Sequence, residues 1–253
     1  MAGYTERLEN RGLDGLALRI AGCLAMAWGA AQQILPQSSV DWATYMLWFS
    51  YTIFAFLLAE GVRRSTDKGL YFRRLLVFAV ISEFPYDLLF NDSLWDTSSQ
   101  NVMFTLLAGF IVLCAAEAVK KRFDNMILTL LTLVILGAGF TYVTWRFNCE
   151  MGLYGILLIV FFYISLNVTY TRLMELIFFV VFLLYVAADN YFNILVNDLY
   201  YSFPDKSFAL LAVILTWLYN GKRGPNSIAV KTAFYLFHPV MLLVIWAVGR
   251  SLR

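Results

Sequence analysis

Several apolar stretches of this chain contain carboxyl, amide or imidazole groups, which are costly to place among apolar residues. The stretch "SEFPYDL" carries Glu83 and Asp87 four residues apart, and "FYLFHPVMLL" contains His238, the one histidine of the sequence. Residues four apart share a helix face, so both carboxylates are predicted to point the same way. Histidine is the side chain best able to take and give a proton near neutral pH. Proton transfer is therefore the chemistry that these groups suit.

Other polar residues fall at the ends of apolar stretches. The run "QNVMFTL" begins with Gln100 and Asn101, Glu150 opens a later run, and Asp189 closes another. All are predicted at the depth of Glu83, where they would line a polar site. Two alternatives stay open. Gln100, Glu150 and Asp189 are equally typical of helix caps, and a buried Glu83 or His238 also fits a structural hydrogen bond.

The elements that position these groups are predicted to be membrane helices. The chain of 253 residues is 61% hydrophobic and 14% charged, whereas about a quarter of residues are charged in soluble domains. Repeated apolar runs near 20 residues indicate transmembrane helices. We predict an all-α polytopic bundle, one membrane domain over 1–253, with nine spans. These are 15–35, 43–62, 71–90, 101–119, 125–145, 151–168, 172–189, 207–219 and 230–249.

The distribution of cationic residues predicts the orientation. Of the 19 Lys and Arg residues, fourteen fall in the N-terminal segment (1–14) and the alternate loops that share its side, and four on the other side. Positive charge favours the cytoplasmic side, so the N-terminus is predicted to be cytoplasmic. The aromatic segment 190–206 would then lie in the outer interface. The same cations also suit a phosphorylated cytosolic ligand, and the residues chosen for that role are Arg63, Arg64, Arg73, Arg74, Lys222 and Arg223.

Several kinds of site are not indicated. Cys23, Cys114 and Cys149 have no paired spacing and are interpreted as packing residues. With one histidine and no Cys-x-x-Cys, no metal site is predicted. The sequence also contains no Gly-rich phosphate loop, serine elbow or nucleic-acid motif, so no nucleic-acid partner is expected.

A family resemblance covers most of the chain. The segments "ISEFPYDL", "QNVMFTL", "GLYGILLIVFFY", "WLYNGKRG" and "FYLFHPVMLL" follow in order, and together they resemble the TraX family of membrane proteins. That family is named for a conjugal-transfer protein that acetylates the N-terminus of pilin. The resemblance implies acetyl transfer from acetyl-CoA to an amine of a peptide or pilin-like acceptor. It also implies a place in the bacterial cytoplasmic membrane, with the lipid bilayer as a partner.

Within that resemblance the residues receive roles. His238, Glu83 and Asp87 would be catalytic, the six cations would bind the phosphates of acetyl-CoA, and the polar residues at the outer level, Gln100, Asn101, Glu150 and Asp189, would contact the acceptor and its carbonyl.

The chain also departs from the family pattern. The family's Asp-His pair in the first span corresponds here to Gly29 and Ala30. The histidine of its last span lies three residues earlier, at His238. A catalytically degenerate scaffold or assembly factor is therefore the alternative function, and a small transporter, with the carboxylates as its ion path, is a third.

Overall fold

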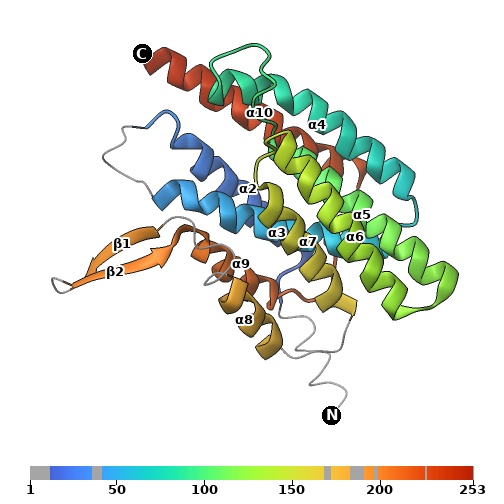
Figure 1. Cartoon of the computed structure of the whole chain (residues 1–253). Coiled ribbons are helices and arrows are strands. Elements are labelled where there is room, and N and C mark those ends of the chain that lie inside the picture. Colours follow the sequence, from blue (N-terminus) through green and yellow to red (C-terminus); the bar gives the residue numbers. More distant parts are fainter. Residues whose placement is uncertain are drawn as a thin grey trace. The chain divides into compact units, whose positions relative to one another are not determined.

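The computed structural model describes residues 12–35, 42–167, 172–182, 191–196, 199–225 and 227–252, and these are mostly helical (Figure 1). Each predicted span contains one helix, so the helical class is confirmed. The helices are α2 (Gly15–Ala31), α3 (Trp42–Arg64), α4 (Lys68–Phe90), α5 (Val102–Phe123), α6 (Met126–Arg146), α7 (Gly152–Asn167), α8 (Arg172–Val181), α9 (Phe208–Thr216) and α10 (Ile228–Leu252).

Four of the described helices are long and apolar enough to cross a membrane: α5, α6, α10, and α3 from Tyr45 onward. α4 is 23 residues long, but its Lys, Arg, Glu and Asp residues make it too polar for that class. α2 and α7 are apolar and shorter, with 17 and 16 residues. The chain is thus a helical membrane protein, while nine spans and a cytoplasmic N-terminus stay predictions.

The chain divides into two compact units, each assembled from two stretches of sequence. One unit comprises Met1–Phe54 with Tyr170–Val230, and the other comprises Ala55–Thr169 with Lys231–Arg253. We call them the first unit and the second unit. α3 and α10 each contribute residues to both units. The single membrane domain over 1–253 stays a prediction.

The first unit joins the start of the described chain to a late loop. Asp14 caps α2 by accepting a hydrogen bond from the Ala17 amide at 2.8 Å. The amides of Leu13 and Gly15 donate to the carbonyls of Leu218 and Lys222 at 2.8 and 2.7 Å. These bonds fix the loop 217–225 against the N-terminal end of α2.

An antiparallel hairpin of β1 (Tyr191–Val196) and β2 (Leu199–Pro204) departs from the all-helical expectation. The residues of β2 are exposed up to Phe203, and a short 3-10 helix, η2 (Asp205–Ser207), follows. At the base of the hairpin, Lys206 is buried, and its Nζ lies 3.4 Å from Asp205 Oδ1 and over the Trp48 ring. The predicted interfacial segment 190–206 therefore contains strands, and its depth in the membrane stays a prediction.

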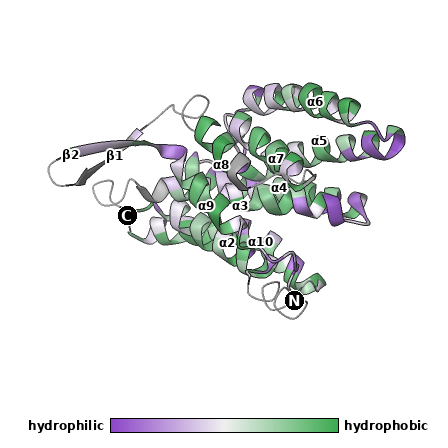
Figure 2. Cartoon of the chain, turned by 90° about the horizontal axis from the view of Figure 1, so that it is seen from below, coloured by the Kyte–Doolittle hydropathy of each residue, from purple (hydrophilic) through white to green (hydrophobic). Residues whose placement is uncertain are grey.

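In the second unit, α5 contacts α4, α6 and α7 and provides much of the core. Gly109 permits the close approach of α7, because a Cβ at this position would overlap the Ile159 side chain. α6 buries only Thr129, Leu133, Gly137 and Thr144, a narrow stripe at helical spacing. Most of its other apolar side chains are exposed, as in a helix that contacts lipid. Figure 2 shows polar residues gathered where α5 ends and α6 begins.

Candidate functional site

α4 brings the two predicted carboxylates into the second unit. Asp67 caps this helix, and its Oδ1 accepts from the Leu70 amide at 2.7 Å. Glu83 and Asp87 are both buried, and Pro85 lies between them within the helix. Proline has no amide hydrogen, so the carbonyl one turn earlier loses its helical partner. The sequence therefore places two costly carboxylates beside a local break in the helical hydrogen bonds.

Asp87 holds the loop that follows α4. Its Oδ1 accepts from Asn91 Nδ2 at 3.0 Å, and its Oδ2 accepts from the Asp96 amide at 2.8 Å. The carbonyl of Asp87 also accepts from the amides of Asn91 and Ser93. Both carboxylate oxygens already have donors, which favours a structural role for Asp87 over the predicted proton transfer.

Asn101 joins the start of α5 to α4. Its Oδ1 caps α5 by accepting from the Met103 amide at 2.9 Å. Its Nδ2 donates to the Ala79 carbonyl at 2.9 Å and to Glu83 Oε2, to which the Asn101 amide also donates at 3.2 Å. Both amide hydrogens of the side chain are thus committed, so Asn101 has none left for a substrate carbonyl.

Glu83 is only half satisfied by these contacts. Its Oε2 has two donors from Asn101, whereas its Oε1 is buried and has no hydrogen-bond partner among the described residues. A buried polar atom without a partner costs about 1–3 kcal/mol. The alternative that Glu83 makes a structural hydrogen bond between helices therefore accounts for one of its oxygens and leaves the other unexplained.

Gln100 and Glu150 join the start of α5 to the turn between α6 and α7. The Gln100 amide donates to the Asn148 carbonyl at 3.2 Å, and the Glu150 amide donates to the Gln100 carbonyl at 2.9 Å. Thr105 Oγ1 donates to the Glu150 carbonyl at 2.6 Å. Gln100 Nε2 donates to the Ser99 carbonyl, which leaves one of its two amide hydrogens for another acceptor.

The carboxyl group of Glu150 belongs to this turn, outside the helices. Its burial raises its pKa from 4.5 to about 7, and a hydrogen bond from the Val102 amide partly opposes that rise. Five predicted site residues, Glu83, Asp87, Gln100, Asn101 and Glu150, thus belong to one hydrogen-bonded region of the second unit. Asp189 lies outside the described residues.

His238 occupies the middle of α10 and is buried, with Pro239 next to it. Its Nδ1 has no hydrogen-bond partner among the described residues, so this nitrogen does not make the structural hydrogen bond that was the alternative to a functional role. For the same reason, no hydrogen bond joins Nδ1 to Glu83 Oε1. Glu83 therefore does not orient the imidazole by a direct hydrogen bond from Oε1 to Nδ1.

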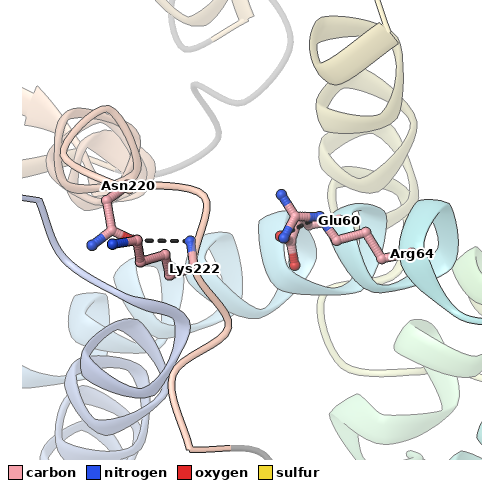
Figure 3. Close-up of polar contacts among 4 residues, drawn as sticks. All are labelled: Glu60, Arg64, Asn220 and Lys222. Carbon is pink, nitrogen blue, oxygen red and sulfur yellow. Dashed lines mark hydrogen bonds and ion pairs between the residues drawn. The ribbon is translucent and has the colours of Figure 1, made fainter. Parts of the chain in front are cut away.

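The predicted cofactor cations divide between the two units. In the second unit, Arg63 and Arg73 are exposed and Arg74 is half-buried. Arg64 Nε lies 3.1 Å from Oε1 of the buried Glu60 (Figure 3).

In the first unit, Lys222 is exposed, and its amide donates to Asn220 Oδ1 at 2.9 Å (Figure 3). Gly224, with φ +66°, closes this loop, since a Cβ there would lie 2.6 Å from Asp14 Oδ2. Arg223 is half-buried.

Glu117 is a further buried carboxylate, which the sequence did not single out. Glu117 on α5 accepts from Tyr163 Oη at 2.8 Å through Oε1, and Lys68 Nζ lies 3.9 Å from Oε2. Glu117 is buried, and its place in the apolar run "LCAAEAV" was the signal that should have identified it.

These observations define a class: a helical membrane protein with carboxylate and imidazole groups buried between its helices. A family model described as TraX protein matches residues 23–249. The chain therefore belongs to the TraX family, and the match includes segments of both units. A search of the curated proteins found no match, and a search of the solved structures found none.

Proposed function

We propose that this TraX-family protein is a membrane-embedded acyltransferase that moves an acetyl group from acetyl-CoA to a primary amine. The observation that carries the proposal is His238, a buried imidazole in the helical bundle whose Nδ1 has no partner among the described residues. Buried polar groups are nearly always hydrogen-bonded, and exceptions often mark a functional site. The family resemblance supplies the reaction class, and the imidazole supplies its base.

The reaction requires a base for the amine and a donor for the developing oxyanion. His238 takes the proton of the attacking amine. Gln100 is the better choice of oxyanion donor, because it keeps one amide hydrogen while Asn101 has committed both. Glu83 contributes negative charge that attracts a protonated amine.

Acetyl-CoA enters this scheme from the side that carries most cations, which we assign to the cytoplasm. Arg63, Arg64, Arg73 and Arg74 belong to the second unit, as His238 does, and guanidinium groups suit phosphate oxygens by their planar fork of donors. The acceptor would be the amine of a peptide or a pilin-like protein in the bacterial cytoplasmic membrane. A contribution of Lys222 and Arg223 stays a prediction from the sequence.

Binding of acetyl-CoA to the detergent-purified protein, measured by calorimetry, tests the donor. We expect micromolar affinity, weakened about tenfold in Arg73→Ala through loss of a charged hydrogen bond. Arg250→Ala, in the last turn of α10, is the matched control and leaves the affinity unchanged. If the wild-type protein binds neither acetyl-CoA nor CoA, this function is wrong.

Replacement of His238 by Gln tests the base. Removing a general base costs about 10²–10⁴-fold in rate, so acetylation of a pilin-like peptide, followed by mass spectrometry, should fall by that factor. Affinity for acetyl-CoA serves as the internal control and should stay constant. Wild-type transfer by His238→Gln would remove the imidazole from the mechanism.

A scaffold without acyl transfer is the second function that a specific observation favours. Gly29 and Ala30, in place of the family's Asp-His pair, are buried in α2 and carry no ionisable group. If that pair is the family's base, this chain lacks it. Absence of acetyl-CoA binding together with stable capture of a conjugation protein would establish this alternative.

A further inference from the structure

Three buried polar atoms in the second unit have no hydrogen-bond partner among the described residues. They are Ser82 Oγ, Glu83 Oε1 and His238 Nδ1. The exposed fractions of the three residues are 0%, 3% and 6%. Since buried polar atoms are nearly always hydrogen-bonded, three without a partner in one unit indicate a shared use.

Ser82 differs from the other buried hydroxyl residues of the helices. Thr52 and Thr129 donate to the carbonyl one turn earlier at 2.7 and 2.9 Å, and Ser50 donates to the Gly22 carbonyl at 2.8 Å. Such local bonds are the usual way in which helical Ser and Thr are satisfied. The hydroxyl of Ser82 makes none of them, although its residue is fully buried.

A ring contact places Ser82 and His238 at one level. Phe78 on α4 stacks on Tyr235 on α10 with their centroids 5.2 Å apart, and Figure 1 shows the two helices running in the same direction. Ser82 follows Phe78 by four residues and His238 follows Tyr235 by three, which correspond to about 6 and 4.5 Å of helix rise. Residues three or four apart share a face, so Ser82 and His238 both lie on the faces that meet.

Glu83 follows Ser82 directly on α4, so it lies at nearly the same level along the helix. Asn101 holds its Oε2, which fixes the carboxyl group and leaves Oε1 as a free acceptor. The group then consists of a carboxylate oxygen, a hydroxyl oxygen and an imidazole nitrogen, and all three can accept a hydrogen bond.

We propose that Ser82 Oγ, Glu83 Oε1 and His238 Nδ1 together bind a primary ammonium group. An ammonium has three N–H donors and one positive charge, which match three acceptors and one carboxylate. This assignment rests on the proposed acyl transfer, since it places the acceptor amine beside its base. Ser82 thereby becomes a substrate-binding residue.

The ammonium gives one proton to His238 Nδ1, and the neutral amine forms a bond to the thioester carbonyl carbon. The C–S bond breaks, and the thiolate leaves with a second proton from the nitrogen. The proton held by His238 then passes to solvent, so one acetyl-CoA and one ammonium yield one amide, one CoA thiol and one proton.

The test is calorimetric binding of benzylamine to the full-length protein in detergent at neutral pH, without acetyl-CoA. Benzyltrimethylammonium has the same charge and no N–H donor, and benzyl alcohol has no charge. We expect benzylamine to bind more tightly than both, and Ser82→Ala and Glu83→Gln each to weaken it about tenfold through loss of a hydrogen bond to a charged group.

Ser50→Ala is the matched control, because it also removes a buried serine hydroxyl from a helix. Ser50 donates a hydrogen bond, so this variant should lower the melting temperature and leave benzylamine binding unchanged. Ser82→Ala removes a hydroxyl without a partner, so it should leave the melting temperature unchanged or raise it. Loss of stability without loss of binding in Ser82→Ala would overturn the proposal.

Equal binding of benzyltrimethylammonium would also overturn it, since that ion cannot donate. The proposed acyl transfer can fail while the ammonium site stands. If benzylamine binding depends on Ser82 but the protein does not bind acetyl-CoA, the ammonium site is retained and the acyltransferase function is wrong. Acetyl transfer that is unchanged in Ser82→Ala, by contrast, retains the enzyme and removes the ammonium site.

Discussion

Glu83 and Glu117 are both buried carboxylates of the second unit, and their surroundings differ in one respect. Each oxygen of Glu117 faces a donor, Tyr163 on one side and Lys68 on the other. Glu83 has donors on Oε2 alone, and its Oε1 has no partner among the described residues. A carboxylate with both oxygens engaged is explained by structure, whereas one with a free buried oxygen still requires a ligand. Depth in an apolar helix identifies costly residues, and hydrogen bonding separates structural from functional ones.

Among changes around these two carboxylates, Asn101→Ala should cause the largest loss of stability. The change removes the cap of α5 and leaves Glu83 Oε2 and the Ala79 carbonyl without the side-chain amide. A cap contributes about 1 kcal/mol and each buried unpaired group costs about 1–3 kcal/mol. We expect a loss of about 3–4 kcal/mol, seen as a lower melting temperature in detergent.

Asn101→Asp is the control for the cap. It keeps an oxygen for the Met103 amide and replaces the donor with a second acceptor facing Glu83 Oε2. If the cap alone matters, this variant unfolds like the wild type. A loss at least as large as in Asn101→Ala would show that the donor to Glu83 is the main term.

The sequence predicted part of this region and could not predict the rest. Apolar runs locate helices because lipid and core select for them, so each predicted span contains a helix. Glu83 and Asn101 were placed at one depth, and the structure shows that they are bonded. Which of their atoms form the hydrogen bond depends on the side-chain rotamers, and helical spacing does not predict rotamers. Ser82 gave no signal, since a helical serine is usually satisfied by its own backbone.

Long-range pairings account for the other misses. The amide of Gln100 meets the Asn148 carbonyl and its own carbonyl meets the Glu150 amide, but no periodicity links residues 50 apart. The segment 190–206 was predicted as interfacial from its aromatic content, and composition did not reveal the register Tyr191↔Pro204 of its hairpin. Composition reports the environment of a segment better than its pairing.

Tyr163→Phe should leave one oxygen of the buried Glu117 carboxylate without its hydrogen-bond donor. The change removes the donor to Oε1 at 2.8 Å and keeps the ring that fills the core. A buried carboxylate oxygen left without a partner costs about 2–3 kcal/mol. We expect Tyr163→Phe to lower the melting temperature, while benzylamine binding stays at the wild-type level. Weakened amine binding in this variant would erase the distinction between the two carboxylates.

Glu150 should make the stability of the hydrogen-bonded region that contains Glu83 depend on pH. Its pKa is raised from 4.5 to about 7 by burial, so the folded state holds more protons than the unfolded state between these values. Stability therefore falls as pH rises through this window, by about 2 kcal/mol between pH 5 and pH 7. Thermal unfolding across that range measures it. Glu150→Gln should flatten the profile, and an unchanged slope in that variant would assign the titration to another group.

The smallest effect should follow from Lys68→Ala. Lys68 Nζ is 3.9 Å from Glu117 Oε2, and 27% of its side chain is exposed, so solvent screens the pair. Exposed ion pairs contribute about 0.2–1 kcal/mol, and we expect a shift in melting temperature at the lower limit of detection. Lys68→Met is the control, since it keeps the apolar stem without the charge. A loss larger than that of Tyr163→Phe would show that Lys68 neutralises Glu117. The cation, more than the tyrosine hydroxyl, would then make that carboxylate a structural group.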